Sequence, residues 1–501
     1  MRSVIVAIDQ GTTSTRAIVY DLDTFQELGA DQLELERYLP QPGWVEHDPL
    51  AIWQSVADVV PRALAQARCE PKAIAAIGIS NQRETIVLWE RDTLRPLGRA
   101  IVWQDRRSTD WCANRAADRR WLQDRTGLIL DPYFSATKIA WLLDHDPTLR
   151  ARMAQGHVVC GTIDSWILAR LTGGSVFATD VTNASRTLLF NIHKLDWDPE
   201  LCAYFDVPMN SLAAIHSSAA DYGETGTLPF LPAGIPIRSL AGDQQAALFG
   251  HGVFGPGSAK CTYGTGAFFL QHTGSSLWPS RHQLLTTVAA MTDATPRYAL
   301  EGSVFVAGAA VQWLRDGLQL FPRSEDTQTL AEQSNPQEPV IFVPAFVGLG
   351  APYWEPEARG AFFGLTRGTT AADLTRATLE SVAYQVNDLI DAARQDIVEP
   401  LHFLHVDGGM TSNDWLMQTQ ADLLGLPVIR ADRSEATARG AAFLAGIGIG
   451  AWNEQRLSQL VMPGKRFDPA LPETVRRKRI LEWQTAIHSL ISYTHAQSRL
   501  L

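Results

Sequence analysis

The first apolar segment of the chain is interrupted by a turn of small residues. VIVAIDQGTTSTRAIVYD, which begins at Val4, carries β-branched residues on both sides of Gly and Thr residues, and this pattern predicts a strand, a turn and a second strand. Apolar residues recur at helical spacing from Ile52 to Leu64, after an Asp48-Pro49 pair typical of a helix start. Strand-like segments (74–80, 85–90, 100–103) and helix-like segments (137–144, 162–171) follow. The first half is therefore predicted to be mixed α/β.

The pattern of the opening segment returns in the second half. Residues 258–274, SAKCTYGTGAFFLQHTG, again predict a strand, a small-residue turn and a strand. IVAIDQG near the start also has a counterpart in FLHVDGG at residues 403–409. Two similar α/β halves predict two domains that face a shared cleft, residues 1–250 and 251–501, joined at the Gly/Pro-rich GHGVFGPGS.

Helical periodicity dominates the rest of the second half. Residues 369–395 predict a long amphipathic helix, and residues 413–425 predict another with Asn413 as its N-cap. Residues 440–452 are rich in Gly and Ala and too few to cross a membrane, so they predict a buried helix. The last helix, about 473–496, is expected to pack as an appendage.

Composition and charge exclude several classes of protein. The 501 residues are 46% hydrophobic, which indicates two or three domains with substantial cores. The net charge of −11 argues against a chain-wide electrostatic contact with nucleic acid or an anionic membrane. Five widely spaced cysteines suggest neither disulfides nor a zinc site, and no apolar run reaches about 18 residues. We expect a cytoplasmic protein without membrane insertion.

The commonest nucleotide-binding and hydrolase signatures are missing. The sequence contains no G-x-x-x-x-G-K-[ST] loop and no G-x-S-x-G nucleophile elbow. One G-x-G-x-x-G occurs at Gly250 to Gly255, but it precedes a predicted strand, whereas a dinucleotide-binding loop follows a strand and opens a helix.

Three turns rich in Asp, Gly and Thr remain as candidate phosphate-binding elements: DQGTTSTR from Asp9, YGTGA from Tyr263 and DGGMTSN from Asp407. Glycine permits close approach of the backbone to a phosphate, hydroxyl and amide groups donate to its oxygens, and Arg16 adds positive charge. Asp9 could hold Mg²⁺, directly or through water. Each turn alone could be a plain hairpin, but a triphosphate needs several such turns to converge.

A second group of residues suits a small polar substrate. Arg83 and Glu84 of NQRET, at a strand end, could donate to and accept from hydroxyl groups, unless they form a solvated surface ion pair. Asp243 of AGDQQ precedes a predicted helix, where it could serve as a general base or simply as an N-cap. Trp103 and Phe268 could form an apolar wall for the C–H face of a polyol, or belong to the core.

These motifs resemble one known family. The combination of DQGTTSTR, GWVEHDP, NQRET, WQDRR, DPYFSATK, AGDQQAALFG, YGTGAF, GLGAPYW and DGGMTSN is similar to the glycerol kinases of the FGGY carbohydrate kinase family, from residue 4 to about 450. The resemblance implies an α/β fold with two ribonuclease-H-like domains, as in the actin-like ATPases, around an interdomain cleft. It also implies ATP-dependent phosphorylation of glycerol to sn-glycerol 3-phosphate, with ATP and Mg²⁺ as cofactors and a homo-oligomer, dimer or tetramer, as the assembly.

The resemblance also assigns roles to residues. The glycerol site would comprise Arg83, Glu84, Trp103, Tyr133, Asp243, Gln244 and Phe268. The nucleotide site would comprise Thr12, Thr13, Ser14, Arg16, Thr265, Gly308, Gln312, Gly409 and Asn413. Asp243 would be the catalytic base, and Asp9 would organise Mg²⁺ through water.

The sequence departs from the family in one regulatory segment. Members that respond to fructose 1,6-bisphosphate carry a Gly/Arg loop before the AGDQQ strand, but residues 226–237 contain no arginine. They also lack the histidine of relatives that are activated by a phosphotransferase, so we expect neither control. A kinase for another polyol or a ketose such as xylulose, and a nucleotide-dependent switch without small-molecule phosphorylation, remain the alternative functions.

Overall fold

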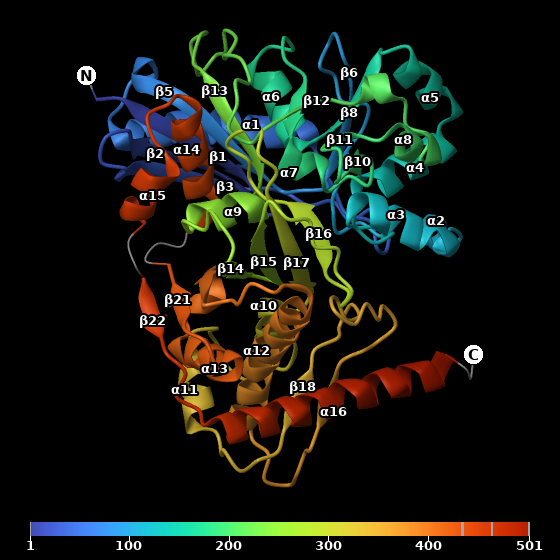
Figure 1. Cartoon of the computed structure of the whole chain (residues 1–501), viewed down its shortest axis with the longest axis vertical. Coiled ribbons are helices and arrows are strands. Elements are labelled where there is room, and N and C mark those ends of the chain that lie inside the picture. The colour runs from blue at the N-terminus through green and yellow to red at the C-terminus, as the bar shows by residue number, and fades with distance from the viewer. Residues whose placement is uncertain (1, 432–434, 462–463, 499–501) are drawn as a thin grey trace.

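The polypeptide forms an upper and a lower lobe, as Figure 1 shows. The structure is a computed structural model and describes residues 2–431, 435–461 and 464–498. Within these ranges, no helix is long and apolar enough to cross a membrane.

The upper lobe is built on a five-stranded sheet with the order β13-β5-β1-β2-β3. Its strands are β1 (Val4–Gln10), β2 (Ser14–Asp21), β3 (Glu27–Glu34), β5 (Ile74–Asn81) and β13 (Ile237–Gly242). The first three pair antiparallel, whereas β5 and β13 are parallel to β1 and to each other. The predicted opening hairpin, β1 and β2, is confirmed.

Helices cover both faces of this sheet. Val4, Val6 and Ile8 share a core cluster with α1 (Pro49–Ala67), whereas the alternate residues Ile5 and Ala7 pack with α14 (Ala436–Gly448). Burial on both faces explains the unbroken apolar run at the start of the chain. The Asp48 side chain accepts a hydrogen bond from the Leu50 amide, so the predicted start of α1 is confirmed.

Beside this sheet, the upper lobe carries a four-stranded sheet with the order β4-β7-β6-β8. Its strands are β4 (Glu46–His47), β7 (Ala100–Ile101), β6 (Ile86–Glu90) and β8 (Val158–Thr162). The strand predicted over 100–103 is therefore shorter than expected. The remaining elements of this lobe are α2 (Thr109–Ala113), α3 (Arg119–Thr126), α4 (Ser135–His145), α5 (Pro147–Ala154), α6 (Ile163–Leu171), β9 (Ala178–Asp180), α7 (Val181–Ala184), β10 (Phe190–Asn191), β11 (Asp196–Trp197), α8 (Pro199–Tyr204), β12 (Ala214–His216), α9 (Asp243–Gly250) and α15 (Glu454–Leu460).

The lower lobe is built on a seven-stranded sheet with the order β16-β17-β15-β14-β20-β21-β22. Its strands are β14 (Ser258–Tyr263), β15 (Ala267–Gly274), β16 (Leu285–Val288), β17 (Tyr298–Val304), β20 (Phe403–Asp407), β21 (Val428–Arg430) and β22 (Lys465–Phe467). Its other elements are α10 (Gly308–Gln312), α11 (Asp326–Gln333), β18 (Ile341–Val343), β19 (Ala361–Phe363), α12 (Ala371–Asp396), η5 (Gly409–Ser412), α13 (Asp414–Leu424) and α16 (Glu473–Ser498). The long helix predicted over 369–395 and the Asn413 N-cap of α13 are confirmed.

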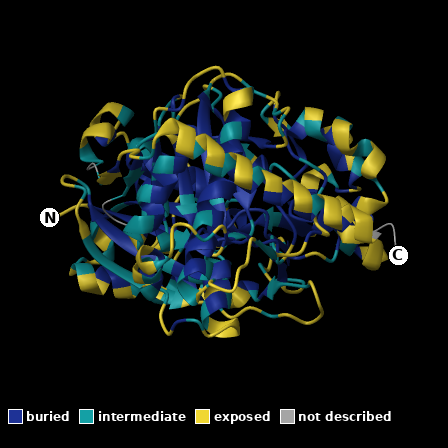
Figure 2. Ribbon diagram, turned by 90° about the horizontal axis from the view of Figure 1, so that it is seen from below, coloured by how far each residue is buried: buried dark blue, intermediate teal, exposed yellow. Residues whose placement is uncertain are grey.

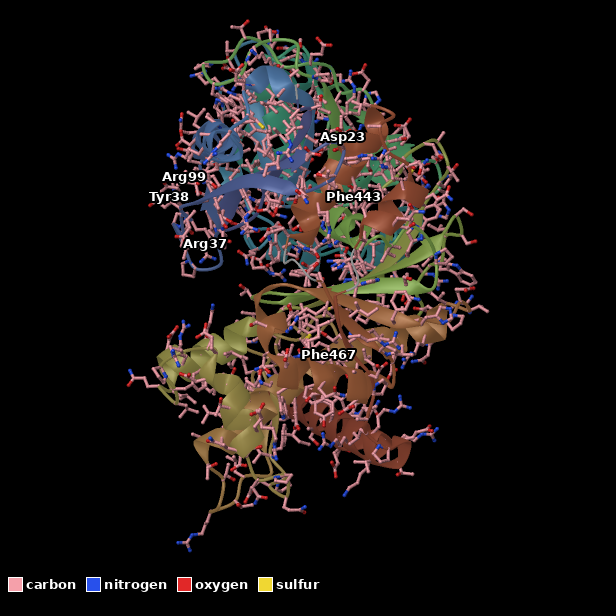
Figure 3. The ribbon with its side chains drawn as sticks, turned by 90° about the vertical axis from the view of Figure 1, so that its left-hand side faces the viewer. Asp23, Arg37, Tyr38, Arg99, Phe443 and Phe467 are labelled. Carbon is pink, nitrogen blue, oxygen red and sulfur yellow. The ribbon has the colours of Figure 1, made fainter. Side chains whose placement is uncertain are left out.

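The chain returns to the upper lobe near its end. The buried helix predicted over 440–452 is α14, which begins and ends four residues earlier than predicted, at Ala436 and Gly448. Figure 3 labels Phe443 of α14 in the upper lobe and Phe467 of β22 in the lower lobe. The Phe443 ring lies 4.5 Å from that of Phe25. The division of the chain at residue 250 stays a prediction, and α14 is a part of the second half that the first sheet needs for its own core.

Helix α16 lies along the lower lobe with most of its surface exposed, as Figure 2 shows. It is attached through Trp483, whose ring stacks on Tyr384 of α12 with centroids 5.1 Å apart. The Trp483 Nε1 donates to Asp388 Oδ2 at 2.7 Å, and the Tyr353 hydroxyl donates to the same oxygen at 2.9 Å. Burial raises the pKa of Asp388 to about 7.

The raised pKa of Asp388 predicts a pH-dependent stability. In the folded protein the carboxyl loses its proton only near pH 7, compared with 3.8 for an ordinary aspartate. The protonated Asp388 carboxyl therefore contributes its full stabilisation of the folded state below pH 3.8, and this stabilisation is lost as the pH rises to about 7. We expect Asp388→Asn to gain stability relative to the wild type over this range, by at most roughly 4 kcal/mol. Thermal unfolding of both proteins at several pH values measures this, and parallel curves would contradict it.

Candidate active site

The first predicted phosphate turn joins β1 to β2. The Gly11 amide donates to the Ser14 carbonyl at 2.9 Å, which closes the turn around Thr12 and Thr13. Arg16 pairs with Glu435, just before α14, and donates to Gln32. The turn is thus part of the upper lobe, and a phosphate would have to compete with Glu435 for Arg16.

Asp9 lies on β1 just before this turn. Its Oδ1 accepts a hydrogen bond from the Ser80 hydroxyl at 2.9 Å. Burial raises the pKa of Asp9 to about 6, and the negative charge of Asp243 contributes to the same shift. A cation bound at Asp9 would favour the charged form of this carboxylate.

Arg83 and Glu84 lie in the segment that leaves β5. Arg83 is 2% exposed and Glu84 is 1% exposed, so the interpretation as a solvated surface ion pair is wrong. Glu84 has a φ of 59°, a left-handed conformation that a non-glycine residue adopts at a cost and that is frequent at functional sites. The Glu84 carboxylate accepts from Arg186 Nε at 2.6 Å.

The terminal nitrogens of Arg83 are already engaged. Glu301 of β17, in the lower lobe, accepts from Nη1 at 2.6 Å and from Nη2 at 2.9 Å. The third nitrogen, Nε, lies 3.2 Å from Asp243 Oδ1. Of the three nitrogens, Nε is the one that faces the candidate base.

Asp243 is the first residue of α9. The N-cap is Gly242, so the interpretation of Asp243 as a simple N-cap is wrong. Its Oδ1 accepts from the Gln244 amide at 2.7 Å, and its Oδ2 accepts from Gln244 Nε2 at 3.2 Å. The side chain is 28% exposed, although Arg83 beside it is buried. A carboxylate held on one side and open on the other suits a group that takes a proton from a ligand.

Three of the predicted substrate residues form an aromatic cluster. The Trp103 ring lies 5.4 Å from that of Tyr133 and 6.0 Å from that of Phe268. Trp103 and Tyr133 come from the upper lobe, and Phe268 comes from β15 of the lower lobe. Trp103 Nε1 donates to Thr12 Oγ1 at 2.8 Å, which connects the cluster to the first phosphate turn. Burial raises the pKa of Tyr133, so its hydroxyl keeps its proton.

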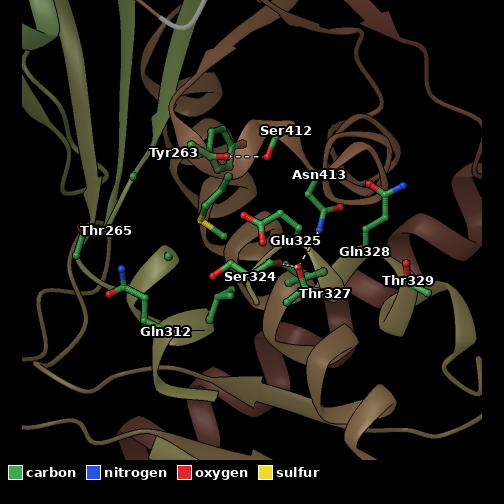
Figure 4. A pocket seen from close by; sticks show the side chains of 16 residues that line it. Tyr263, Thr265, Gln312, Ser324, Glu325, Thr327, Gln328, Thr329, Ser412 and Asn413 are labelled. Carbon is green, nitrogen blue, oxygen red and sulfur yellow. Dashed lines mark hydrogen bonds between the residues drawn. The ribbon is translucent and has the colours of Figure 1, made fainter. Parts of the chain in front are cut away.

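A pocket of about 500 Å³ lies in the lower lobe, as Figure 4 shows. Five residues of the predicted nucleotide site line it: Thr265, Gly308, Gln312, Gly409 and Asn413. The turns that carry Thr265, Gly409 and Asn413 touch, because a Cβ on Gly408 (φ 93°) would overlap the backbone of Tyr263. Thr12, Thr13, Ser14 and Arg16 are not among the lining residues, so the structure brings together two of the three turns in this pocket.

Sequence reasoning missed part of this pocket. Polar residues in and just before α11 also line it: Ser324, Glu325, Thr327, Gln328 and Thr329. Asn413 Nδ2 donates to Thr327 Oγ1 at 3.3 Å, so the missed residues contact the predicted ones. The one available signal was the polar run SEDTQT ahead of a helix, which is equally typical of an ordinary surface helix start.

The family comparisons cover nearly the whole chain. A family model described as the N-terminal domain of the FGGY family of carbohydrate kinases matches residues 4–250, and its C-terminal counterpart matches residues 259–449. A Limosilactobacillus reuteri protein named glycerol kinase is 49% identical over 486 residues, which is 96% of this chain and 97% of that protein. Another with the same name, from Methylobacterium nodulans, is 50% identical over 497 residues, or 98% and 99%.

A solved structure gives the same picture. The crystal structure of Plasmodium falciparum glycerol kinase with ADP is similar at a TM-score of 0.91 with 36% sequence identity, and the match covers 98% of both chains. The predicted α/β fold class of the actin-like carbohydrate kinases is thereby confirmed. With both family models matched in order along one polypeptide, this chain belongs to the FGGY family of carbohydrate kinases.

Proposed function

We propose that this protein transfers the γ-phosphoryl group of ATP to glycerol and forms sn-glycerol 3-phosphate. The observation that carries the proposal is the partly exposed carboxylate of Asp243, whose Oδ1 lies 3.2 Å from Arg83 Nε. This carboxylate lies in an interlobe site that also includes Glu84 and an aromatic cluster. The relatives named glycerol kinase, at 49% and 50% identity, support this choice of substrate.

In this proposal the protein mainly positions the reactants. Asp243 accepts the proton of a terminal hydroxyl as its oxygen attacks the γ-phosphorus in line. Arg83 and Glu84 hold the remaining hydroxyls, and the aromatic cluster covers the C–H face, so that one end of the prochiral triol is presented. ATP occupies the 500 Å³ pocket, with its phosphates directed toward the first turn. Closure of the lobes excludes water, which would otherwise take the phosphoryl group.

The donor set fits a magnesium ion. Mg²⁺ is usually held by one or two carboxylates together with substrate phosphates and water. Within the described ranges no three His, Cys, Asp or Glu residues cluster at a metal-binding distance. Asp9, directly or through water, is the residue that would hold the ion beside Asp243. When bound, the ion neutralises charge on the phosphates.

A coupled assay for ADP release tests the proposal. With ATP and Mg²⁺, we expect glycerol to give a kcat/KM at least about 100-fold above that for xylulose, because a site matched to the hydroxyls of one substrate leaves polar groups unpaired with another. Dihydroxyacetone and erythritol extend the comparison. A preference for xylulose would indicate a ketose kinase, and ATP turnover that glycerol does not stimulate would indicate a nucleotide-dependent switch.

The nucleotide pocket can be tested separately. Gly409 lines it, and a Cβ there would meet no described atom within 4 Å, so a larger side chain would extend into the pocket. We expect Gly409→Val to raise the KM for ATP about 10-fold and to leave the KM for glycerol unchanged. Gly98→Val, at another glycine with open surroundings, is the control. An unchanged KM for ATP would place the nucleotide elsewhere.

The resemblance also leads us to propose a cytoplasmic homo-oligomer, a dimer or a tetramer, with no nucleic-acid partner. Light scattering of the purified protein measures the assembly, and a monomer at micromolar concentration would contradict that part of the proposal.

A further inference from the structure

Two charged residues of the lower lobe lie beneath the candidate base. Lys260 on β14 pairs in register with Leu270 on β15, and Leu270 pairs with Glu301 on β17. Residues paired across adjacent strands leave the sheet on the same face. Lys260 and Glu301 therefore flank Leu270 in one row, which we call the Lys-Leu-Glu row.

This row faces the helix that carries Asp243. Leu270 packs with Leu248 of α9, and Figure 1 shows α9 between the two lobes. Lys260 and Glu301 are both 0% exposed. A charge buried in this way is costly unless the structure pairs it with a partner.

Each of the two charges has one partner that contacts Asp243; Glu301 also accepts from Arg186 Nη2 at 2.9 Å, and Lys260 also donates to Thr262 Oγ1 at 2.9 Å. Glu301 receives both terminal nitrogens of Arg83, at 2.6 and 2.9 Å, and leaves Nε facing Asp243 Oδ1 at 3.2 Å. Lys260 Nζ donates to Gln244 Oε1, and Gln244 Nε2 donates to Asp243 Oδ2 at 3.2 Å. Each carboxylate oxygen of Asp243 is thus linked to a residue of the lower lobe through one intermediate side chain. Arg83 links Oδ1 to Glu301, and Gln244 links Oδ2 to Lys260.

The chemistry of these groups fixes their orientation. An ammonium group only donates hydrogen bonds, so the Gln244 atom that faces Lys260 must be the amide oxygen, and the NH₂ group must point toward Asp243. A carboxylate that binds both Nη atoms of an arginine holds the guanidinium plane in one orientation. Neither Lys260 nor Glu301 forms a hydrogen bond or an ion pair with Asp243, so each acts through another residue.

We propose that Lys260 and Glu301 are positioning residues: from the lower lobe they orient Gln244 and Arg83, which in turn aim the Asp243 carboxylate at the substrate hydroxyl. The candidate base belongs to the upper lobe, so its aim depends on the contact between the lobes. This inference rests on the proposed function, because it assumes that Asp243 is the general base.

Lys260→Met tests the inference most directly. Methionine has a similar length, and the two groups that lose a hydrogen bond from the ammonium, Gln244 Oε1 and Thr262 Oγ1, are neutral. We expect kcat/KM for glycerol to fall about 10–100-fold, since a small misplacement of a catalytic group costs up to about 100-fold. The KM for ATP should stay unchanged. Asp388→Asn, which alters a buried carboxylate of the same lobe outside this cluster, is the control and should leave both constants unchanged.

A double variant separates positioning from general damage. If Lys260 acts through the base, Lys260→Met should change kcat less than about 3-fold in an Asp243→Asn background, because the group that it aims is already lost. Full, additive losses would overturn the inference. A Lys260→Met chain that does not fold would also overturn it, because the ammonium would then be a structural requirement.

Glu301→Gln tests the role of Glu301 in the same way. We expect the same fall in kcat/KM for glycerol and the same result in an Asp243→Asn background. A Glu301→Gln chain that does not fold would remove Glu301 from the proposal. High activity of Asp243→Asn would contradict the role of Asp243 as general base, whereas high activity of Lys260→Met beside an inactive Asp243→Asn would contradict only the positioning role.

Discussion

Asp243→Asn is expected to lower kcat by about 10²–10⁴-fold, the usual range for the loss of a general base. The amide keeps the size of the side chain and one acceptor oxygen for Arg83 Nε and the Gln244 amide, so the start of α9 should persist. It cannot accept the hydroxyl proton. Steady-state kinetics with glycerol and ATP measure the change, and we expect kcat to fall more than the KM for glycerol rises.

Asp48→Asn provides the matched control. Asp48 caps α1 through its side-chain oxygen, and asparagine caps a helix equally well, so this substitution makes the same chemical change away from the site. Its kcat should equal that of the wild type. If Asp243→Asn retained more than about a tenth of the normal turnover, another group would have to take the proton.

Gly440→Ala is expected to destabilise the upper lobe severely. A Cβ on Gly440 of α14 would overlap the backbone carbonyl of Ala246 on α9, and backbone cannot move aside as a flexible side chain does. Overpacking of a core costs about 1–3 kcal/mol and occasionally more, and contact with backbone places this site at the upper end. Because α9 begins with Asp243, displacement of the helix should also reduce kcat.

The effect can be measured by thermal unfolding, where we expect the upper lobe to melt at least several degrees lower. Gly98→Ala serves as the control, because a Cβ there would meet no described atom within 4 Å. A normal melting temperature for Gly440→Ala would mean that α9 and α14 are not in close backbone contact. It would also argue against the packing of α14 on the five-stranded sheet.

The sequence identified the local elements well where neighbours along the chain decide them. The β1–β2 hairpin, the Asp48 and Asn413 caps and the length of α12 depend on side-chain alternation, helical periodicity and hydrogen bonds within a few residues. The ends of the elements were predicted less accurately, for example the start of α14, because the boundary of a buried helix depends on what the helix packs against.

For the candidate site, the sequence supplied the residue types and the structure supplied their partners. Arg83, Glu84 and Asp243 could be singled out because charged residues at strand ends and helix starts are unusual in apolar surroundings. Whether they were buried, and whether Asp243 was only a cap, depended on contacts that no spacing encodes. The polar residues before α11 were missed for the same reason.

By itself, the sequence determined the opening hairpin, the longer helices, the three glycine-rich turns and the residues able to carry phosphoryl-transfer chemistry, since these follow from local backbone preferences and side-chain chemistry. Only the tertiary structure decided that Glu301 holds Arg83, 218 positions earlier in the chain. It also decided that α14 covers one face of the five-stranded sheet. The physical reason is that a buried charge or an apolar face must find its complement in space, and separation along the chain carries no record of which complement is chosen.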